Sequence, residues 1–128
     1  MAITTLDSHT PHVDETRING VEVFVLAGEF DAFSAPQLED RLIAAIERGS
    51  YEVVVDMSAV TFIDLSTLNA IIRAMKLVYR HNGHLVVGCD SRPVLRAIDL
   101  AGLRHSMRVF ATRDEAIAAV VGERNGRA

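Results

Sequence analysis

Short apolar runs alternate with longer amphipathic segments along most of this chain, and this alternation restricts the fold more than any other feature. Val21 to Leu26 and Val53 to Val55 are rich in β-branched residues, as buried strands are. A segment between these two runs repeats its apolar residues at helical spacing, at Leu38, Leu42 and Ile46. Strands that alternate with helices are typical of an α/β domain with a mainly parallel sheet.

The dipeptide Asn19-Gly20 predicts that the domain begins with a hairpin. A type I′ turn needs positive φ at both of its central residues, and Asn-Gly is a favoured pair. The turn joins a weak strand over Val13 to Ile18 to the run that starts at Val21. Residues 1–12 before it are polar and carry no periodicity, so we expect that segment to be loose.

Capping residues and glycines predict where the helices begin and end. Ser34 is placed to cap the first helix, Gln37 completes a capping box, and Gly49 ends the element. The second helix is expected to start after Asp64 and to end with Gly83 as the residue after the cap. The later elements are predicted as a strand over 84–89, a helix over 91–101 capped by Ser91, a strand over 108–111 and a helix over 112–121 opened by Thr112.

The predicted order is therefore β-β-α-β-α-β-α-β-α in one α/β domain. We expect a mixed, mainly parallel sheet of about five strands, packed by about four helices. The chain has 128 residues, of which 49% are hydrophobic, and this is enough for one domain with its own core. The domain is expected over 13–121, followed by a disordered polar tail over 122–128.

Composition argues against several classes of function. The net charge of −4, without any basic cluster, disfavours a nucleic-acid partner. No apolar run is long enough to cross a membrane and no signal peptide is evident, so we expect a cytoplasmic protein without a membrane partner. Cys89 is expected to be a small buried hydrophobe. The histidines are scattered, and neither a nucleophile elbow nor a glycine-rich phosphate loop is present, so we predict no catalytic residue, metal or cofactor.

Residues 56–68 are not explained by packing alone. A strand is expected to end at Asp56, a loop to pass through Phe62, and a helix to start at Asp64. The Asp64 carboxylate is placed to accept from the N–H of Ser66 or Thr67 and so to cap that helix.

A helical wheel divides the helix after Asp64 into two faces. The stripe expected to face the core comprises Leu68, Ile71, Ile72, Met75 and Tyr79. The face expected to point outward comprises Ser66, Ala70, Arg73 and Leu77. The outward face is partly apolar, which favours a partner-binding surface. The alternative is that Ser66 and Thr67 are merely good first-turn residues.

The segment resembles a known family signature, Asp-[Leu/Met]-Ser-x-Val-x-Phe-[Ile/Met]-Asp-Ser-[Ser/Thr]-Gly-Leu, which joins a strand to a helix. The matching residues are Asp56, Met57, Ser58, Val60, Phe62, Ile63, Asp64, Ser66 and Leu68. Leu26 to Asp31 is similar to the family's Leu-x-Gly-Glu-[Leu/Phe]-Asp, and Leu100 to Leu103 is similar to its Ser-Gly-Leu. The family is the STAS domain family, the anti-sigma factor antagonists, and the resemblance implies its fold over 13–121.

The resemblance also implies a function without enzymatic activity. Domains of this family bind an anti-sigma factor, usually a serine kinase, which then releases its sigma factor. The kinase phosphorylates the serine directly after the motif aspartate, and this breaks the complex. The partner-binding residues implied here are Asp31, Asp64, Leu65, Ser66, Thr67, Asn69, Arg73 and Leu77. We expect a monomer or a weak dimer.

The chain departs from the family at the phosphorylated position. Leu65 follows Asp64 and has no hydroxyl, and Thr67 stands where the family has glycine. Ser66 is then either a displaced phosphoacceptor or a structural residue in a binder that is never phosphorylated. An alternative function, which fits the missing serine equally well, is an accessory STAS subunit of a transporter or lipid-trafficking complex.

Overall fold

A hairpin with a two-residue turn opens the part of the chain that the structure, a computed structural model, describes (residues 9–126). Strand β1 (His12–Ile18) pairs antiparallel with β2 (Val21–Phe30). Asn19 and Gly20 have φ values of 53° and 80°, as a type I′ turn requires. The predicted hairpin is therefore confirmed.

Three further strands extend the sheet in sequence order. They are β3 (Glu52–Ile63), β4 (His84–Gly88) and β5 (Val109–Phe110). The described sheet has the order β1-β2-β3-β4-β5, and β2 to β5 run parallel to one another. Parallel neighbours in sequence order need one crossover each, and crossovers of one hand place all their helices on one face of the sheet.

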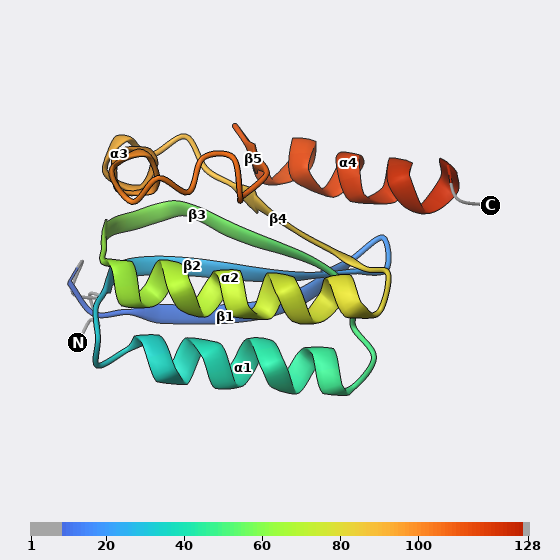
Figure 1. Cartoon of the computed structure of the whole chain (residues 1–128), viewed down its shortest axis with the longest axis horizontal. Helices are drawn as coiled ribbons and strands as arrows, with labels where there is room; N and C mark the ends of the chain where they lie inside the picture. The colour runs from blue at the N-terminus through green and yellow to red at the C-terminus, as the bar shows by residue number, and fades with distance from the viewer. Residues whose placement is uncertain (1–8, 127–128) are drawn as a thin grey trace, which may run out of the picture.

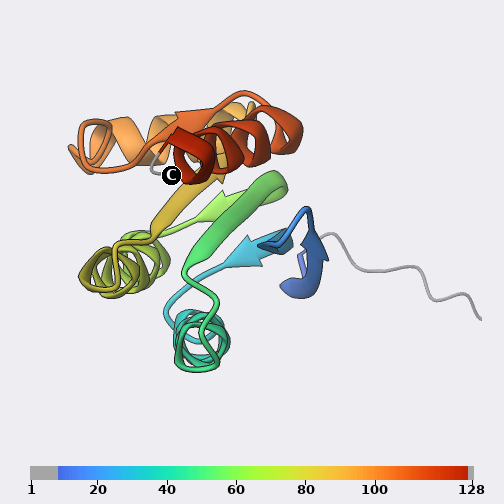
Figure 2. The same cartoon turned by 90° about the vertical axis from the view of Figure 1, so that its right-hand side faces the viewer.

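The three helices that connect parallel strands obey this rule, and the fourth helix follows the last strand. They are α1 (Ala35–Glu47), α2 (Leu65–Arg80), α3 (Arg92–Leu100) and α4 (Arg113–Gly126). Figure 2 shows α1, α2 and α3 in succession along one face, whereas α4 lies over the other. The predicted order of elements and the mixed α/β fold are confirmed.

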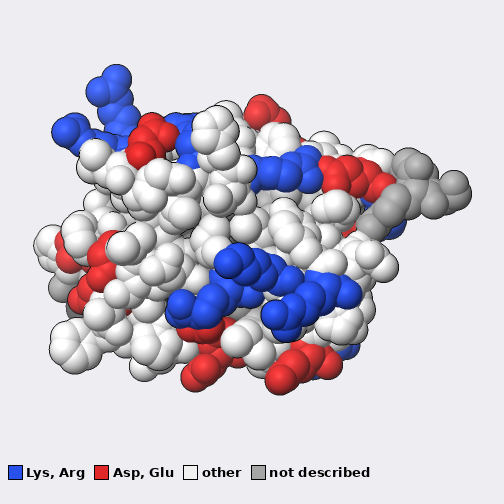
Figure 3. Space-filling view, viewed as in Figure 1, with Lys and Arg blue, Asp and Glu red and all other residues white. Residues whose placement is uncertain are grey.

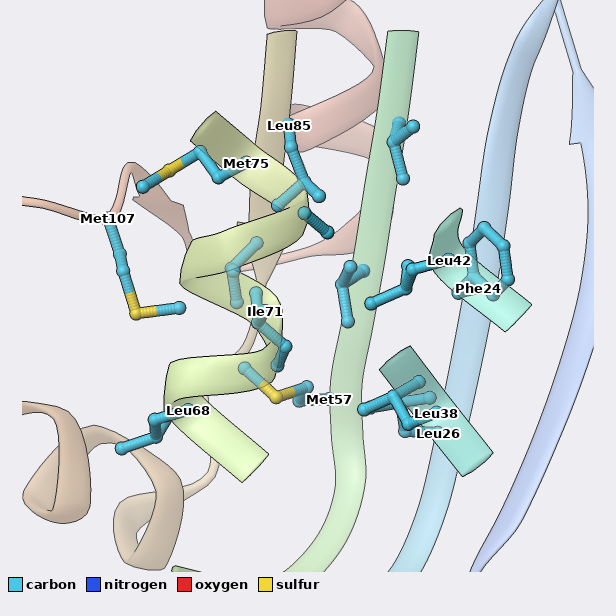
Figure 4. Packing of buried hydrophobic residues seen from close by; sticks show 14 of the residues in the cluster. Phe24, Leu26, Leu38, Leu42, Met57, Leu68, Ile71, Met75, Leu85 and Met107 are labelled. Carbon is cyan, nitrogen blue, oxygen red and sulfur yellow. The ribbon is translucent and has the colours of Figure 1, made fainter. Parts of the chain in front are cut away.

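Two apolar clusters lie on the two faces of the sheet. The larger cluster joins the sheet to α1, α2 and α3, and includes Phe24, Leu42 and Ile71 (Figure 4). The smaller cluster lies under α4 and includes Val54 and Ile117. Since both faces of the central strands are covered, β3 carries a continuous apolar run instead of an alternating one.

Strand β3 is longer than the sequence predicts. The predicted end is Asp56, yet β3 continues to Ile63 because β2 stays paired with it, with register shifts on either side of the pairs Ala27↔Ala59 and Gly28↔Val60. Ser91 supports this extension, since its Oγ donates to the carbonyl of Val60 at 3.2 Å. Ser91 therefore does not cap α3 with its side chain, contrary to the prediction.

The described residues extend the predicted domain at both ends, while residues 127–128 of the predicted tail lie outside them. The N–H of Glu29 donates to the carbonyl of His9 at 3.4 Å, so residues 9–11 lie against β2, while 1–8 are outside the described residues. At the other end, α4 continues beyond its predicted end at Val121 to Gly126. Nε of Arg124 donates to Glu52 at 2.8 Å, which holds the last turns against the sheet. The predicted Thr112 cap is confirmed, because its Oγ1 accepts from the N–H of Glu115 at 3.1 Å.

The residue that follows the C-terminal cap of α2 is not the glycine that the sequence predicts. Asn82, not Gly83, has the left-handed backbone conformation, with φ of 59°. Gly83 is needed for space, because a Cβ there would lie 2.0 Å from the carbonyl oxygen of Tyr51. The glycine therefore permits the close approach of the loops that precede β3 and β4.

We expect Gly83→Ala to destabilise the domain by about 1–3 kcal/mol, because the clash is with backbone that cannot swing away. Gly122→Ala is the matched control. A Cβ at Gly122 meets nothing within 4 Å, and the residue lies inside α4. We expect this control to raise the free energy of unfolding by about 0.4–1 kcal/mol. Urea denaturation of both variants measures the two effects, and a Gly83→Ala protein as stable as the wild type would contradict the packing described.

Glu22 is an almost buried carboxyl in the hairpin, only 9% exposed. Its desolvation and its contact with Glu15 raise its pKa, and these effects outweigh Arg17 and Ser50, which lower it. A folded-state pKa above the unfolded value of about 4.5 means that stability is lost as the pH rises through the folded pKa.

We therefore expect Glu22→Gln to raise the thermal midpoint at pH 7.5, because the amide avoids burying a charge beside Glu15. The gain should shrink as the pH falls and vanish below about pH 4.5, where the wild-type carboxyl is protonated in both states. Thermal melts from pH 4 to pH 8 test this. A variant that is less stable than the wild type at pH 7.5 would show that the pairing with Arg17 dominates.

Candidate functional site

The candidate site lies where β2 and β3 end together. Phe30 pairs with Ile63 at the ends of these parallel strands, and the N–H of Asp64 donates to the carbonyl of Phe30 at 3.2 Å. The loops that lead into α1 and α2 therefore start side by side, at the left of Figure 1. The carboxyl edge of a parallel sheet is the usual place for a binding site in α/β folds.

Asp64 caps α2, as the sequence predicts. Its Oδ1 accepts from the N–H of Thr67 at 3.1 Å and from the Thr67 hydroxyl at 3.3 Å. Thr67, not Ser66, is thus the partner, and its side chain is fully buried. Thr67 therefore holds the cap in place and presents no surface to a partner.

The capped first turn exposes a leucine. Leu65 directly follows Asp64 and is 55% exposed. Two other large apolar side chains are exposed at the same edge of the sheet: Phe62, at the end of β3, and Phe33, in the loop before α1. Exposed apolar groups from three separate segments at one edge are typical of a surface that another protein covers.

Asp31 organises the loop that exposes Phe33. Its Oδ1 accepts from the N–H of Phe33 at 2.9 Å and from that of Ser34 at 3.2 Å. The Ser34 hydroxyl accepts in turn from the N–H of Asp31 at 2.9 Å. The predicted capping box of Ser34 and Gln37 is therefore wrong: Ser34 makes no side-chain cap, because its hydroxyl is engaged by Asp31.

The face of α2 that the helical wheel places outward instead packs against α1. Ala70 is fully buried and Leu77 is partly buried against the core. Arg73 remains exposed and its guanidinium donates to both oxygens of Glu39 at 2.7 Å, which lowers the pKa of that carboxyl. The apolar character of this face thus has an explanation within the domain. Leu77 is not available as an exposed contact.

The true solvent-facing side of α2 is rotated from the predicted one. Tyr79, placed in the inner stripe by the wheel, is 43% exposed, whereas Val78 is buried. Asn69 and Lys76 are exposed. Figure 3 shows basic side chains gathered over α2, above acidic ones from α1. Ser66 is partly buried and lines a hollow of about 260 Å³ between the two helices.

Asp56, the first residue of the motif, has a structural role that the sequence does not reveal. It is 6% exposed, and its Oδ2 accepts from Nε of Arg113 at 2.8 Å. Its Oδ1 accepts from the N–H of Ser58 at 3.0 Å. Asp56 therefore ties β3 to the first turn of α4, on the face opposite α2.

Two further findings concern residues 9–126 as a whole. In this part of the chain no group of three or more His, Cys, Asp or Glu side chains is placed to hold a metal ion. None of its helices is both long enough and apolar enough to cross a membrane.

Cys89 is buried, as predicted, and burial raises the pKa of its thiol.

Comparison with known proteins decides the family. The family model described as "STAS domain" matches residues 12–116, from the start of β1 into α4. The chain belongs to the STAS domain family. The match contains every residue of the candidate site.

Similar STAS proteins span nearly the same length. An anti-sigma-F factor antagonist of Mycobacterium tuberculosis, RsfB, is 30% identical over 109 residues, or 85% of this chain and 88% of that protein. The anti-sigma-B factor antagonist of Bacillus subtilis is 28% identical over 93 residues, or 73% of this chain and 84% of that protein. The crystal structure of an anti-sigma factor antagonist from Mycobacterium paratuberculosis superposes with a TM-score of 0.75 at 26% identity, covering 87% of this chain and 94% of that one.

Proposed function

We propose that this STAS domain is an anti-sigma factor antagonist. The relatives that it resembles along most of their length carry this function in their names. The observation that carries the proposal is the exposed Leu65 directly after the Asp64 cap, at the same edge of the sheet as the exposed Phe62 and Phe33. A protein partner is the ligand that best fits large apolar side chains exposed together at one edge of the sheet.

The proposed docking site, called the edge surface below, spans the two loops at the carboxyl edge and the first half of α2. It comprises Asp31, Phe33, Phe62, Asp64, Leu65, Ser66, Asn69 and Arg73. Asp31 and Asp64 mainly hold their loops in shape, since their carboxylates accept backbone N–H groups. The exposed apolar side chains are proposed to supply most of the binding energy, because their burial by a partner removes the largest apolar area from water.

The proposed partner is an anti-sigma factor of the serine-kinase type. An anti-sigma factor bound to the edge surface would no longer bind its sigma factor. The released sigma factor would then be free to act. The proposal includes a cytoplasmic location, where the partner and its sigma factor would meet this chain.

We further propose that the complex is not released by phosphorylation. Leu65 offers no hydroxyl at the position after Asp64. Ser66 lines a hollow towards α1 that Glu39 and Arg73 also line, and the Arg73 guanidinium is already engaged by both oxygens of Glu39. A phosphate of about −1.5 to −2 charge there would lie near a carboxylate, which disfavours it. Ser66 is therefore assigned a structural role in a permanently unphosphorylated binder.

Incubation with the anti-sigma kinase and ATP is expected to leave the wild-type chain unphosphorylated. Leu65→Ser is expected to accept about one phosphate, at residue 65, because its hydroxyl would stand at the open N–H groups of the α2 terminus. Mass spectrometry with site mapping measures both. Rapid and stoichiometric phosphorylation of Ser66 in the wild type would show that the switch has moved by one residue.

The proposed function is tested by calorimetric titration of the purified chain with each anti-sigma protein encoded in the same genome. Binding of one of them, with release of its sigma factor in a transcription assay, supports the proposal. Failure to bind any of them, together with co-purification with a membrane transporter, would favour the role of a transporter subunit instead.

A further inference from the structure

The exposed face of α3 combines leucines with arginines in a way that folding does not require. Leu100 is 80% exposed, so it contributes little to the core. Together with Leu95, Arg92, Arg96 and Asp99 it lines a shallow hollow of about 420 Å³. The opposite face of α3 supplies the buried contacts of the helix.

The two arginines are exposed and form no ion pair with the carboxylates of the described residues. Among residues 9–126, neither Arg92 nor Arg96 lies within ion-pair distance of a carboxylate. Asp99, the acid nearest in sequence on the helix, is held by Nε of Arg104 at 2.7 Å. Arg92 lies in the first turn of α3, which contains no acidic residue. The helix dipole disfavours a positive charge at that end.

The start of α3 lies at the same end of the molecule as the edge surface (Figure 1). The Ser91 hydroxyl, at the start of α3, donates to the carbonyl of Val60, two residues before the exposed Phe62. Figure 1 shows α3 at the same end of the molecule as the start of α2. Basic side chains project at the corner of the molecule that α3 occupies (Figure 3).

We propose that the exposed face of α3 is a second docking surface for the anti-sigma factor, and that it binds a segment of that partner carrying carboxylates beside apolar side chains. The inference rests on the proposed function. Two unpaired guanidinium groups one helical turn apart are suited to bind carboxylates. The leucines beside them are suited to contact apolar side chains of the same partner. An anionic membrane fits less well, because the chain as a whole has a net charge of −4.

The test is the double variant Arg92→Glu/Arg96→Glu, titrated against the anti-sigma factor that binds the wild type. We expect its Kd to rise at least about tenfold at 50 mM salt, and its affinity to depend less on salt than that of the wild type. Its thermal midpoint is expected to stay equal or to rise, because glutamates suit the first turns of a helix. Leu100→Ser is expected to weaken binding at every salt concentration.

The matched control is Lys76→Glu/Arg80→Glu, which makes the same change of charge on the second half of α2. Both residues are exposed and lie outside the edge surface. We expect the control to bind nearly as the wild type does. An equal loss in the control would show general electrostatic attraction and would overturn the assignment to α3.

Other outcomes separate this inference from the proposed function. If the α3 variants bind as the wild type does while Leu65→Asp does not, the α3 surface is wrong and the proposed function stands. If the wild type binds no anti-sigma factor, both fail. If phosphatidylserine vesicles retain the wild type but not the double variant, and affinity for the anti-sigma factor is unchanged, the surface belongs to a membrane contact and the inference is overturned.

Discussion

Leu65→Asp is expected to abolish tight binding of the anti-sigma factor without unfolding the domain. The side chain is 55% exposed, so its replacement leaves the core intact. A carboxylate in the first turn of α2 is also favoured by the helix dipole, which keeps stability near that of the wild type. In the complex, however, the variant loses an apolar contact and buries an unpaired charge. We expect a loss of about 3 kcal/mol, or roughly a hundredfold in Kd.

Two companion variants separate the causes of that loss. Leu65→Asn has nearly the same shape as aspartate but no charge, so the difference in affinity between these two variants reports the cost of the buried charge. Leu65→Ala shortens the side chain without adding polarity and should lose least. Calorimetric titration gives the three affinities, and circular dichroism melts confirm that each variant is folded. Unchanged affinity in Leu65→Asp would remove α2 from the interface and leave the proposed function without its main support.

The order of the elements could be predicted from the sequence because each signal was local. Asn19-Gly20 determines its own turn, and the apolar runs mark their own strands. The length of β3 could not be predicted in this way. Its extension to Ile63 depends on pairing with β2 through register shifts, and this information is spread over two distant segments.

The candidate site was predicted well where a single residue acts on its own backbone and poorly where two elements meet. Asp64 caps α2 as expected, since a cap needs only the residues of one turn. Ser34 is an equally good capping residue, yet Asp31 engages its hydroxyl. Sequence alone does not rank these competing local hydrogen bonds. Phe33 was missed because one exposed aromatic residue in a loop carries no periodic signal.

The predicted inner stripe of α2 is confirmed at Leu68, Ile71 and Met75, which are buried. The predicted outward face was wrong at Ala70 and Leu77, for a definite physical reason. A helical wheel identifies an apolar stripe, but it assumes that the helix packs against a single other element.

In this fold α2 packs through Leu68 and Ile71 into the core and also lies against α1. Ala70 is fully buried, between Ser66 and Arg73, which face α1. The small size of Ala70 is itself the signal, because helices that lie close together need small residues between them. The wheel treats that residue as a neutral member of the outward face.

Ala70→Asp is expected to unfold the domain, and it tests this packing directly. Ala70 is fully buried where α2 faces α1, so an aspartate there would bring both excess volume and an unpaired charge into a closed interface. We expect a loss of about 4 kcal/mol or more, a large part of the roughly 5–15 kcal/mol that stabilises a domain of this kind.

The matched control is Asn69→Asp, which introduces the same residue one position earlier, on the exposed side of α2. A change at a solvated position should alter the free energy of unfolding by no more than about 0.5 kcal/mol. Circular dichroism melts of the two variants give the comparison. If Ala70 faced outward, as the helical wheel predicts, the two variants would be equally stable. If α2 packs against α1 at Ala70, only Asn69→Asp will fold.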